Sequence, residues 1–116
     1  MPKRHSYHGI SVSKPREVLE QGVFELARRV AELAGLTTPV ARKTVICDDR
    51  YYAPGYGQPN DAMIKAVRLC ASLEGILLDP VYSGKAMAAL IDHIGMGKFK
   101  AGETVVFIHT GGQTAL

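Results

Sequence analysis

The residues with the clearest chemical potential lie at a corner between a short apolar run and a helical pattern. The run at 76–78 predicts a minimal buried strand, Asp79 and Pro80 predict a rigid turn, and a helix is expected after it. Tyr82 and Ser83 are the polar side chains on this corner. Because open α/β sheets bind ligands at the carboxyl ends of their strands, both side chains are candidates for contact with a ligand.

Each corner residue also has a purely structural interpretation. Tyr82 could be a half-buried aromatic side chain that keeps its hydroxyl in water, and Ser83 stands where a helix N-cap is wanted. Lys85 falls in the first helical turn, where a solvated surface charge is the expected role. Asp79 occupies the place of the first glycine of a P-loop, which argues against a nucleoside triphosphate site.

Two further stretches carry candidate residues. The loop at 48–59 contains Tyr56 between two glycines, with prolines on both sides, so this aromatic side chain is expected to be held in position. Near the end, Thr110 and Gly111 follow His109, and the glycine would allow the backbone to approach a ligand closely. His109 alone is expected to be a satisfied histidine at a strand end.

The elements that must position these residues alternate along the chain. Strands are predicted at 9–13, 44–47, 76–78 and 103–109, with no hairpin signal between them. Three helices are predicted between them, with Ser13 and Asn60 as N-caps of the first two and Gly35 and Gly75 as their ends. This order predicts an α/β fold with a parallel sheet.

Each predicted helix has an apolar stripe that is expected to pack on the sheet. The stripes are Val23, Leu26, Ala27, Val30, Ala31 and Ala34 in the first helix, Met63, Ala66, Val67 and Cys70 in the second, and Met87, Leu90, Ile91 and Ile94 in the third.

Composition excludes several classes of protein. The chain of 116 residues fits one domain or part of one, and its net charge of +3 comes from scattered basic residues, which argues against nucleic-acid binding. Cys47 and Cys70 lack metal-ligand spacing, so no metal site is predicted and both are expected to be buried thiols in a reducing cytoplasm. No apolar run approaches a membrane span, and residues 1–7 are expected to be a disordered leader before a domain at 8–116.

The three stretches together resemble one family of enzymes. An Asp-Pro-Val-Tyr corner followed by Gly84 and Lys85, a Pro-Gly-Tyr-Gly loop upstream, and a His-Thr-Gly-Gly end occur here in that family's order. The chain is similar to the pyridoxal-phosphate-dependent D-cysteine desulfhydrase and 1-aminocyclopropane-1-carboxylate deaminase family, of the tryptophan synthase β-like fold type II. The resemblance runs from about Gly9 to Leu116 and implies a partial three-layer α/β fold, the carboxyl-terminal part of the large domain.

The resemblance also implies roles for individual residues. Tyr82 would act at the substrate face of pyridoxal 5'-phosphate, and Tyr56 would position it. Ser83 would face the pyridine nitrogen, where a hydroxyl is typical of the desulfhydrase and a glutamate of the deaminase. Thr110 and Gly111 would lie near the cofactor ring. A hydroxyl that caps a helix can also face the ring, so the two interpretations of Ser83 are compatible.

Three parts of the family's site have no counterpart in this sequence: the Schiff-base lysine, the glycine-rich phosphate loop and the serine-asparagine segment. The chain alone is therefore expected to be inactive, and to expose strand edges and apolar helix faces unless something covers them. Three hypotheses remain open: a carboxyl-terminal fragment of a D-cysteine desulfhydrase-like lyase, a deaminase-like half of a split enzyme with a lysine-bearing partner, and a non-catalytic α/β interaction module or homo-oligomer.

Overall fold

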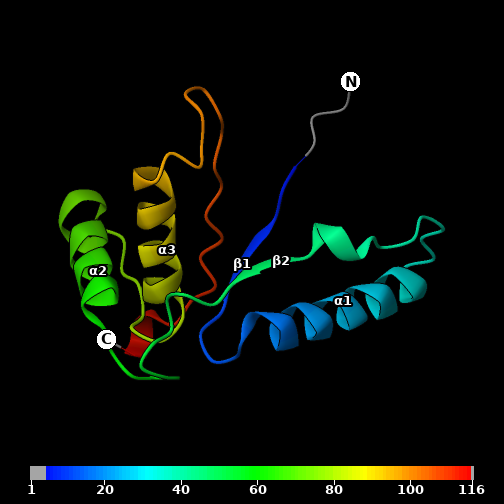
Figure 1. Ribbon diagram of the computed structural model, residues 1–116. Coiled ribbons are helices and arrows are strands. Elements are labelled where there is room, and N and C mark those ends of the chain that lie inside the picture. Colours follow the sequence, from blue (N-terminus) through cyan, green and yellow to red (C-terminus); the bar gives the residue numbers. More distant parts are fainter. Residues whose placement is uncertain (1–4, 116) are drawn as a thin grey trace.

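The computed structural model describes residues 5–115 as an α/β fold, with one pair of parallel strands between helices (Figure 1). Its elements are β1 (His8–Ile10), α1 (Arg16–Leu33), the 3₁₀ turn η1 (Arg42–Thr44), β2 (Ile46–Asp48), α2 (Asp61–Glu74), α3 (Ser83–Gly95) and the 3₁₀ turn η2 (Gln113–Ala115). The predicted α/β class is confirmed. The leader predicted at 1–7 falls largely on residues 1–4, which lie outside the described residues.

The two strands pair in parallel, with His8 opposite Ile46 and Ile10 opposite Asp48. Helix α1 packs against this pair, and the buried Glu20 carboxylate accepts the Cys47 amide at 3.1 Å. The prediction that Ser13 caps α1 is wrong, because the helix begins at Arg16, whose N–H donates to the Asp49 carboxylate at 2.8 Å. A carboxylate beyond the second strand therefore satisfies an amide at the start of this helix.

Helices α2 and α3 lie side by side and form most of the core (Figure 1). The predicted caps of α2 are confirmed: the Asn60 side chain accepts the Met63 amide at 2.9 Å, and Gly75 ends the helix in a left-handed conformation. The two helices are in tight contact at Gly84, where a Cβ atom would lie 2.8 Å from the Val67 Cγ2 atom. A glycine is therefore required at this contact.

The predicted packing stripe of α3 is wrong in part. The face that is buried carries Lys85, Ala88, Ala89 and His93. Ile91 and Ile94 on the predicted stripe remain exposed. Small side chains allow α3 to approach α2, whereas Met87 and Leu90 of the predicted stripe are only partly buried.

Two of the four predicted strands do not form. The runs at 76–78 and 103–109 carry no strand hydrogen bonds, and the side chains of Val106 and Ile108 are 78% and 75% exposed. A strand exists only when its backbone pairs with that of a neighbour, and within residues 5–115 neither run takes part in a backbone ladder. Only half of the predicted ladder is therefore present in the part of the chain that the structure describes.

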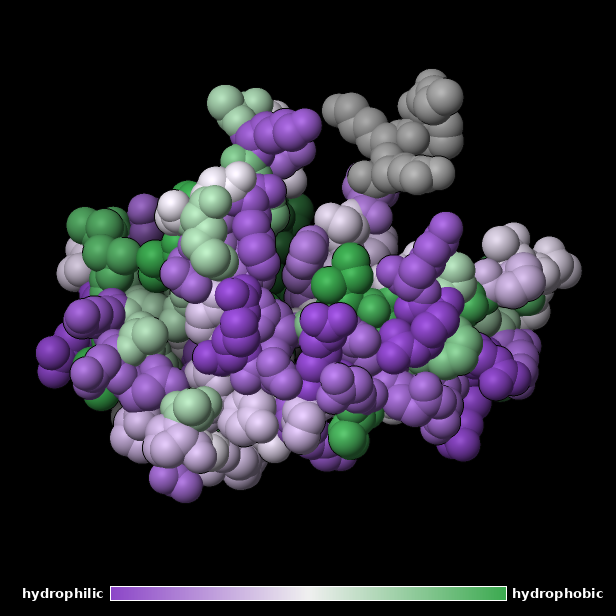
Figure 2. Space-filling model, in the orientation of Figure 1, coloured by the Kyte–Doolittle hydropathy of each residue, from purple (hydrophilic) through white to green (hydrophobic). Residues whose placement is uncertain are grey.

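Much of the apolar surface is consequently uncovered, as the sequence predicted. On α1, Leu26 and Val30 are 61% and 56% exposed, although they belong to its apolar stripe. Figure 2 shows apolar patches over the strand pair, below α1 and at one end of α2. Across residues 5–115, none of the helices combines the length and hydropathy needed to span a bilayer.

Candidate active site

The centre of the candidate site is a pair of tyrosines that the fold brings together from the loop after β2 and the start of α3. The hydroxyls of Tyr56 and Tyr82 are hydrogen-bonded to each other, and their rings meet edge to face with centroids 6.0 Å apart. Both side chains are about half exposed. The hydrogen bond with Tyr56 raises the pKa of Tyr82, because it favours the protonated phenol. Two of the predicted site residues are thus in direct contact.

The corner that presents Tyr82 is organised by Asp79. Its buried carboxylate accepts the amides of Val81, Tyr82 and Ser83 at 2.7–2.8 Å, and the Ser83 hydroxyl at 2.6 Å. Burial acts to raise the pKa of Asp79, but the hydrogen bond from Ser83 and the three amides outweigh it, so the pKa is lowered. Asp79 therefore fixes the backbone on both sides of Tyr82.

Ser83 does not act as the predicted N-cap. It is the first residue of α3, and its side chain is almost completely buried. Its hydroxyl donates to the Asp79 carboxylate and accepts the Asp79 amide at 2.9 Å. Asp79 takes over the capping because a carboxylate at the turn can reach several amides at once, whereas the serine hydroxyl points back to the turn.

The terminal segment reaches the same corner. His109 accepts the Gly111 amide at Nδ1, so its Nε2 carries the proton and donates to the Leu77 carbonyl at 2.8 Å. Gly112 lies against Asp79, since a Cβ atom there would be 2.8 Å from the Asp79 Cγ atom. His109 is thus satisfied, as predicted. Thr110 is exposed between these two contacts and Gly111 has a positive φ of 98°.

Lys85 is the clearest correction to the sequence analysis. It is completely buried, and its ammonium donates to the carbonyls of Tyr52 at 3.0 Å and Gly55 at 2.9 Å. Burial lowers the pKa of this lysine. A surface charge was predicted because the start of a helix offers a cation no favourable dipole, but the carbonyls of the preceding loop supply the missing partners.

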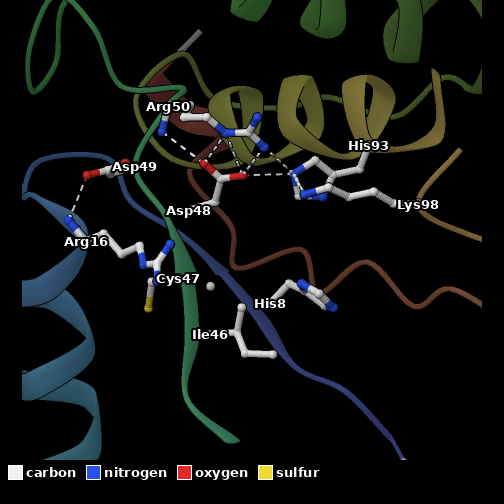
Figure 3. Close-up of a pocket in the computed structure, with 10 residues that line it drawn as sticks. His8, Arg16, Ile46, Cys47, Asp48, Asp49, Arg50, His93 and Lys98 are labelled. Carbon is white, nitrogen blue, oxygen red and sulfur yellow. Dashed lines mark hydrogen bonds and ion pairs between the residues drawn. The ribbon is translucent and has the colours of Figure 1, made fainter. Parts of the chain in front are cut away.

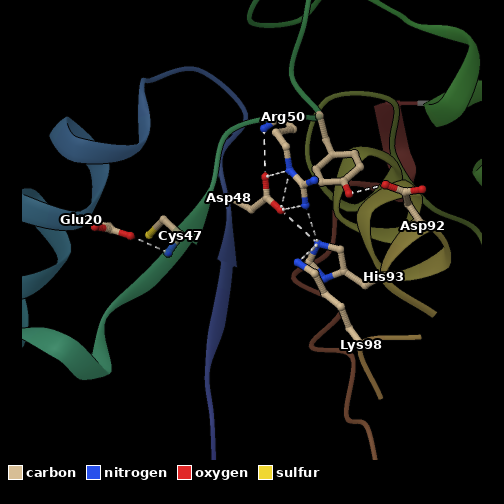
Figure 4. A network of polar contacts seen from close by, with 8 residues as sticks. Glu20, Cys47, Asp48, Arg50, Asp92, His93 and Lys98 are labelled. Carbon is tan, nitrogen blue, oxygen red and sulfur yellow. Dashed lines mark hydrogen bonds and ion pairs between the residues drawn. The ribbon is translucent and has the colours of Figure 1, made fainter. Parts of the chain in front are cut away.

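A second polar cluster ties the beginning of this loop to the far end of α3 (Figure 4). The Asp48 carboxylate binds Arg50 at 2.6 Å and the buried His93 at 3.0 Å. The Tyr51 hydroxyl donates to Asp92 at 2.6 Å. The hydrogen bonds from Arg50 hold the pKa of Asp48 far below its usual range, and burial raises the pKa of Tyr51 to about 12.

This cluster borders an open cavity of about 350 Å³ on the strand pair, lined by His8, Arg16, Asp48, Arg50, His93 and Lys98 among others (Figure 3). No pattern in the sequence predicted this cavity. Asp48 and His93 are far apart in the chain, and no local spacing signals their contact. The available signal was a histidine next to Asp92 in a mainly apolar helical pattern, which is weak.

Comparison with known proteins identifies the class of protein to which this corner belongs. Residues 8–111 match the model of the family described as pyridoxal-phosphate dependent enzyme. The chain is 45% identical over 108 residues to a 1-aminocyclopropane-1-carboxylate deaminase of Burkholderia vietnamiensis, and 46% identical over 109 residues to one of Burkholderia cenocepacia (strain J2315). Both alignments cover 93% of this chain and 32% of the relative.

A solved structure of an ACC deaminase homologue shares the fold, with a TM-score of 0.76 and 36% sequence identity over 90% of this chain and 30% of that one. The chain therefore belongs to the pyridoxal-phosphate dependent enzyme family. It spans about a third of the length of the relatives that it matches, and corresponds to their carboxyl-terminal portion.

The described residues fit one side of a pyridoxal-phosphate site. Tyr56, Tyr82 and Thr110 are exposed polar groups at or beside one corner, and Gly111 offers backbone without a side chain. Lys85, the lysine on this corner, offers no free amine, because its ammonium is bound to two loop carbonyls. These exposed groups are chemically compatible with contact to one side of the cofactor, whereas the bound ammonium of Lys85 is not available for covalent attachment.

Proposed function

We propose that this chain is the carboxyl-terminal part of a pyridoxal-phosphate-dependent lyase of the D-cysteine desulfhydrase type. The proposed reaction removes the β-substituent and then ammonia from a small amino acid. The observation that carries the proposal is the contact between Tyr56 and Tyr82 on a corner where Ser83 supplies a hydroxyl rather than a carboxylate. The free Cys47 and Cys70 support a reducing, cytoplasmic setting.

The chain's own residues would divide the work at this corner. Tyr82 would hold or move a proton at the substrate, and Tyr56 would fix the orientation of its hydroxyl. Ser83, Thr110 and Gly111 would contact the cofactor ring. When bound, the cofactor withdraws electrons from the substrate's α-carbon, which allows groups on that carbon and its neighbour to leave. The phosphate-binding loop and the Schiff-base lysine would come from polypeptide outside residues 5–115. The chain alone would therefore be inactive.

The names of the similar relatives favour a second candidate, a 1-aminocyclopropane-1-carboxylate deaminase activity. The two candidates differ at position 83, where the resemblance associates a glutamate with the deaminase and a hydroxyl with the desulfhydrase. The Ser83 hydroxyl donates its proton to the carboxylate of Asp79, whose pKa is lowered, so position 83 carries a neutral hydroxyl and no acidic group of its own. A neutral hydroxyl is consistent with elimination of a good leaving group.

A chimaera tests the proposal. Residues 8–116 would replace the matching third of the Burkholderia vietnamiensis relative, which supplies the remaining two-thirds of the fold. With Ser83 in place, we expect more turnover of D-cysteine than of 1-aminocyclopropane-1-carboxylate, and Ser83→Glu should reverse this preference. Tyr82→Phe should lower turnover by about 10²-fold or more while the cofactor absorbance is retained. A chimaera that binds the cofactor and prefers the cyclopropane acid with Ser83 would favour the deaminase instead.

A further inference from the structure

Helix α3 and the residue just before it contact the end of β2 and the loop between β2 and α2 at three places, and each contact uses a polar side chain. At the beginning of the loop, Asp92 and His93 bind Tyr51 and Asp48. In the middle, Lys85 binds the carbonyls of Tyr52 and Gly55. Tyr82, the residue just before α3, binds Tyr56. The middle contact is the one that adjoins the tyrosine pair.

Lys85 is well suited to determine where Tyr56 lies. Gly55 directly precedes Tyr56, so a hydrogen bond to the Gly55 carbonyl fixes the peptide that leads into the tyrosine. The ammonium spans two carbonyls, Tyr52 and Gly55, on either side of Ala53 and Pro54. Since Lys85 lies on the first turn of α3, the same rigid element carries both Lys85 and the adjoining Tyr82.

The burial of this lysine needs an explanation that packing alone does not give. Lys85 is completely buried, whereas lysine is seldom fully buried without a partner. No carboxylate forms a salt bridge with it among residues 5–115, and its partners are loop carbonyls only. An apolar side chain of similar length would fill the space without the cost of burying a charge. Unlike an apolar side chain, the ammonium fixes the positions of the Tyr52 and Gly55 carbonyls by donating hydrogen bonds to both.

We propose that Lys85 is a positioning residue for the tyrosine pair: it holds the loop through the carbonyls of Tyr52 and Gly55, and thereby keeps the Tyr56 hydroxyl against that of Tyr82. The assignment of a catalytic consequence rests on the proposed function, but the positioning itself is a property of this chain without cofactor. It can therefore be tested independently of any activity.

The test follows the ionisation of Tyr82 in the full chain by NMR with tyrosine labelled at Cζ. Tyr82 faces Tyr56 and Asp79, and its raised pKa depends first on the hydrogen bond with Tyr56. We expect Lys85→Met to lower the titration midpoint of Tyr82 to the value found in Tyr56→Phe, and to abolish the contacts between the two rings. Added to Tyr56→Phe, the lysine substitution should produce no further shift, because it acts through Tyr56.

A matched control and a measurement without substitution complete the test. Lys65→Met removes an exposed lysine from the neighbouring α2 and should leave the Tyr82 midpoint unchanged. Lys85→Arg, which keeps charged donors, should restore part of the shift. In the unaltered chain, the ¹⁵N-labelled Lys85 ammonium should exchange its protons slowly, as its two hydrogen bonds require. If Lys85→Met does not fold, the Tyr82 midpoint of Lys85→Arg is compared with that of Tyr56→Phe instead, and it should lie above that value. A folded Lys85→Met chain with an unchanged Tyr82 midpoint, or a rapidly exchanging Lys85 ammonium, would overturn the proposal.

Discussion

At the scale of single residues, the Asp79 side chain makes more of the hydrogen bonds that shape the corner than any residue proposed to touch a ligand. Its carboxylate satisfies amides on both sides of Tyr82 and receives the Ser83 hydroxyl, and Gly112 packs against it. The corner's geometry depends on this one side chain because the side chains of Pro80 and Val81 carry no polar atoms that could satisfy the turn.

We expect Asp79→Ala to destabilise the chain by about 2–3 kcal/mol, since it removes a helix cap and leaves buried donors unsatisfied. Asp79→Asn keeps one acceptor oxygen and should cost less. Equilibrium unfolding in urea at pH 7 measures both. Equal losses for the two variants would show that the charge of the carboxylate, rather than its number of acceptors, is what the corner requires.

The lowered pKa of Asp79 also predicts a dependence on acid. Its folded-state pKa lies below the unfolded value of about 3.9, so its contribution to stability is complete above that value and is lost as the pH falls through the folded-state pKa. Asp79→Asn cannot titrate. The free energy of unfolding of this variant should therefore fall less between pH 5 and pH 2 than that of the unaltered chain. Parallel curves would show that other carboxylates, such as Asp48, cause the loss.

At the scale of elements, the close approach of α2 and α3 depends on Gly84. A Cβ atom there would lie 2.5 Å from the Asp79 carbonyl and 3.0 Å from the Met63 Cγ atom. We expect Gly84→Ala to cost about 1–3 kcal/mol by overpacking, and to move Tyr82 because Asp79 must shift. Thermal unfolding measures the first effect and the Tyr56–Tyr82 ring contacts report the second.

Gly95 provides the control within the same helix. No heavy atom lies within 4 Å of the position of its Cβ, so Gly95→Ala should be neutral or stabilise α3 by up to about 1 kcal/mol. If both alanine substitutions have the same effect, helix propensity rather than the contact with α2 determines the outcome.

The sequence predicted best those features that depend on residues close together in the chain. Asn60 and Gly75 cap the two ends of α2 as expected, because a cap is determined by residues within a few positions of the helix end. The contact of Lys85 with Gly55 and that of Asp48 with His93 join separate elements, and no periodicity indicates them. The corner itself was found, but which of its residues makes the cap depends on side-chain geometry that the spacing of Asp79 and Ser83 does not determine.

The failed strands have a different cause. The runs at 76–78 and 103–109 have the composition of strands, but neither forms a helix or takes part in a ladder. Strand composition indicates a side chain that fits a covered sheet, but the backbone pairing needs a neighbour that local sequence does not contain. The composition of these positions therefore correctly indicates residues that suit a sheet, but the prediction that they form strands is wrong for the described residues.

At the scale of the whole molecule, the chain is more open than a self-contained domain of its size. Its accessible surface is 8610 Å², against about 6,200 Å² for a compact protein of this mass, and its radius of gyration is 15.6 Å, against about 13 Å. The uncovered side chains include Leu26 and Val30 on α1 and Val106 on the terminal segment. Surface of this kind promotes association.

We therefore expect the chain alone to associate in a concentration-dependent way, as measured by sedimentation velocity. The double substitution Leu26→Glu and Val30→Glu places two charges on the exposed apolar stripe of α1 and should shift the chain towards smaller species. Arg28→Glu changes the net charge equally from the opposite flank of the helix, where its ion pair with Glu32 is exposed and contributes little. Association should persist in this control, because the apolar stripe is intact. If both variants dissociate alike, repulsion between charges accounts for the change, and the uncovered face of α1 is not the surface through which the chain associates.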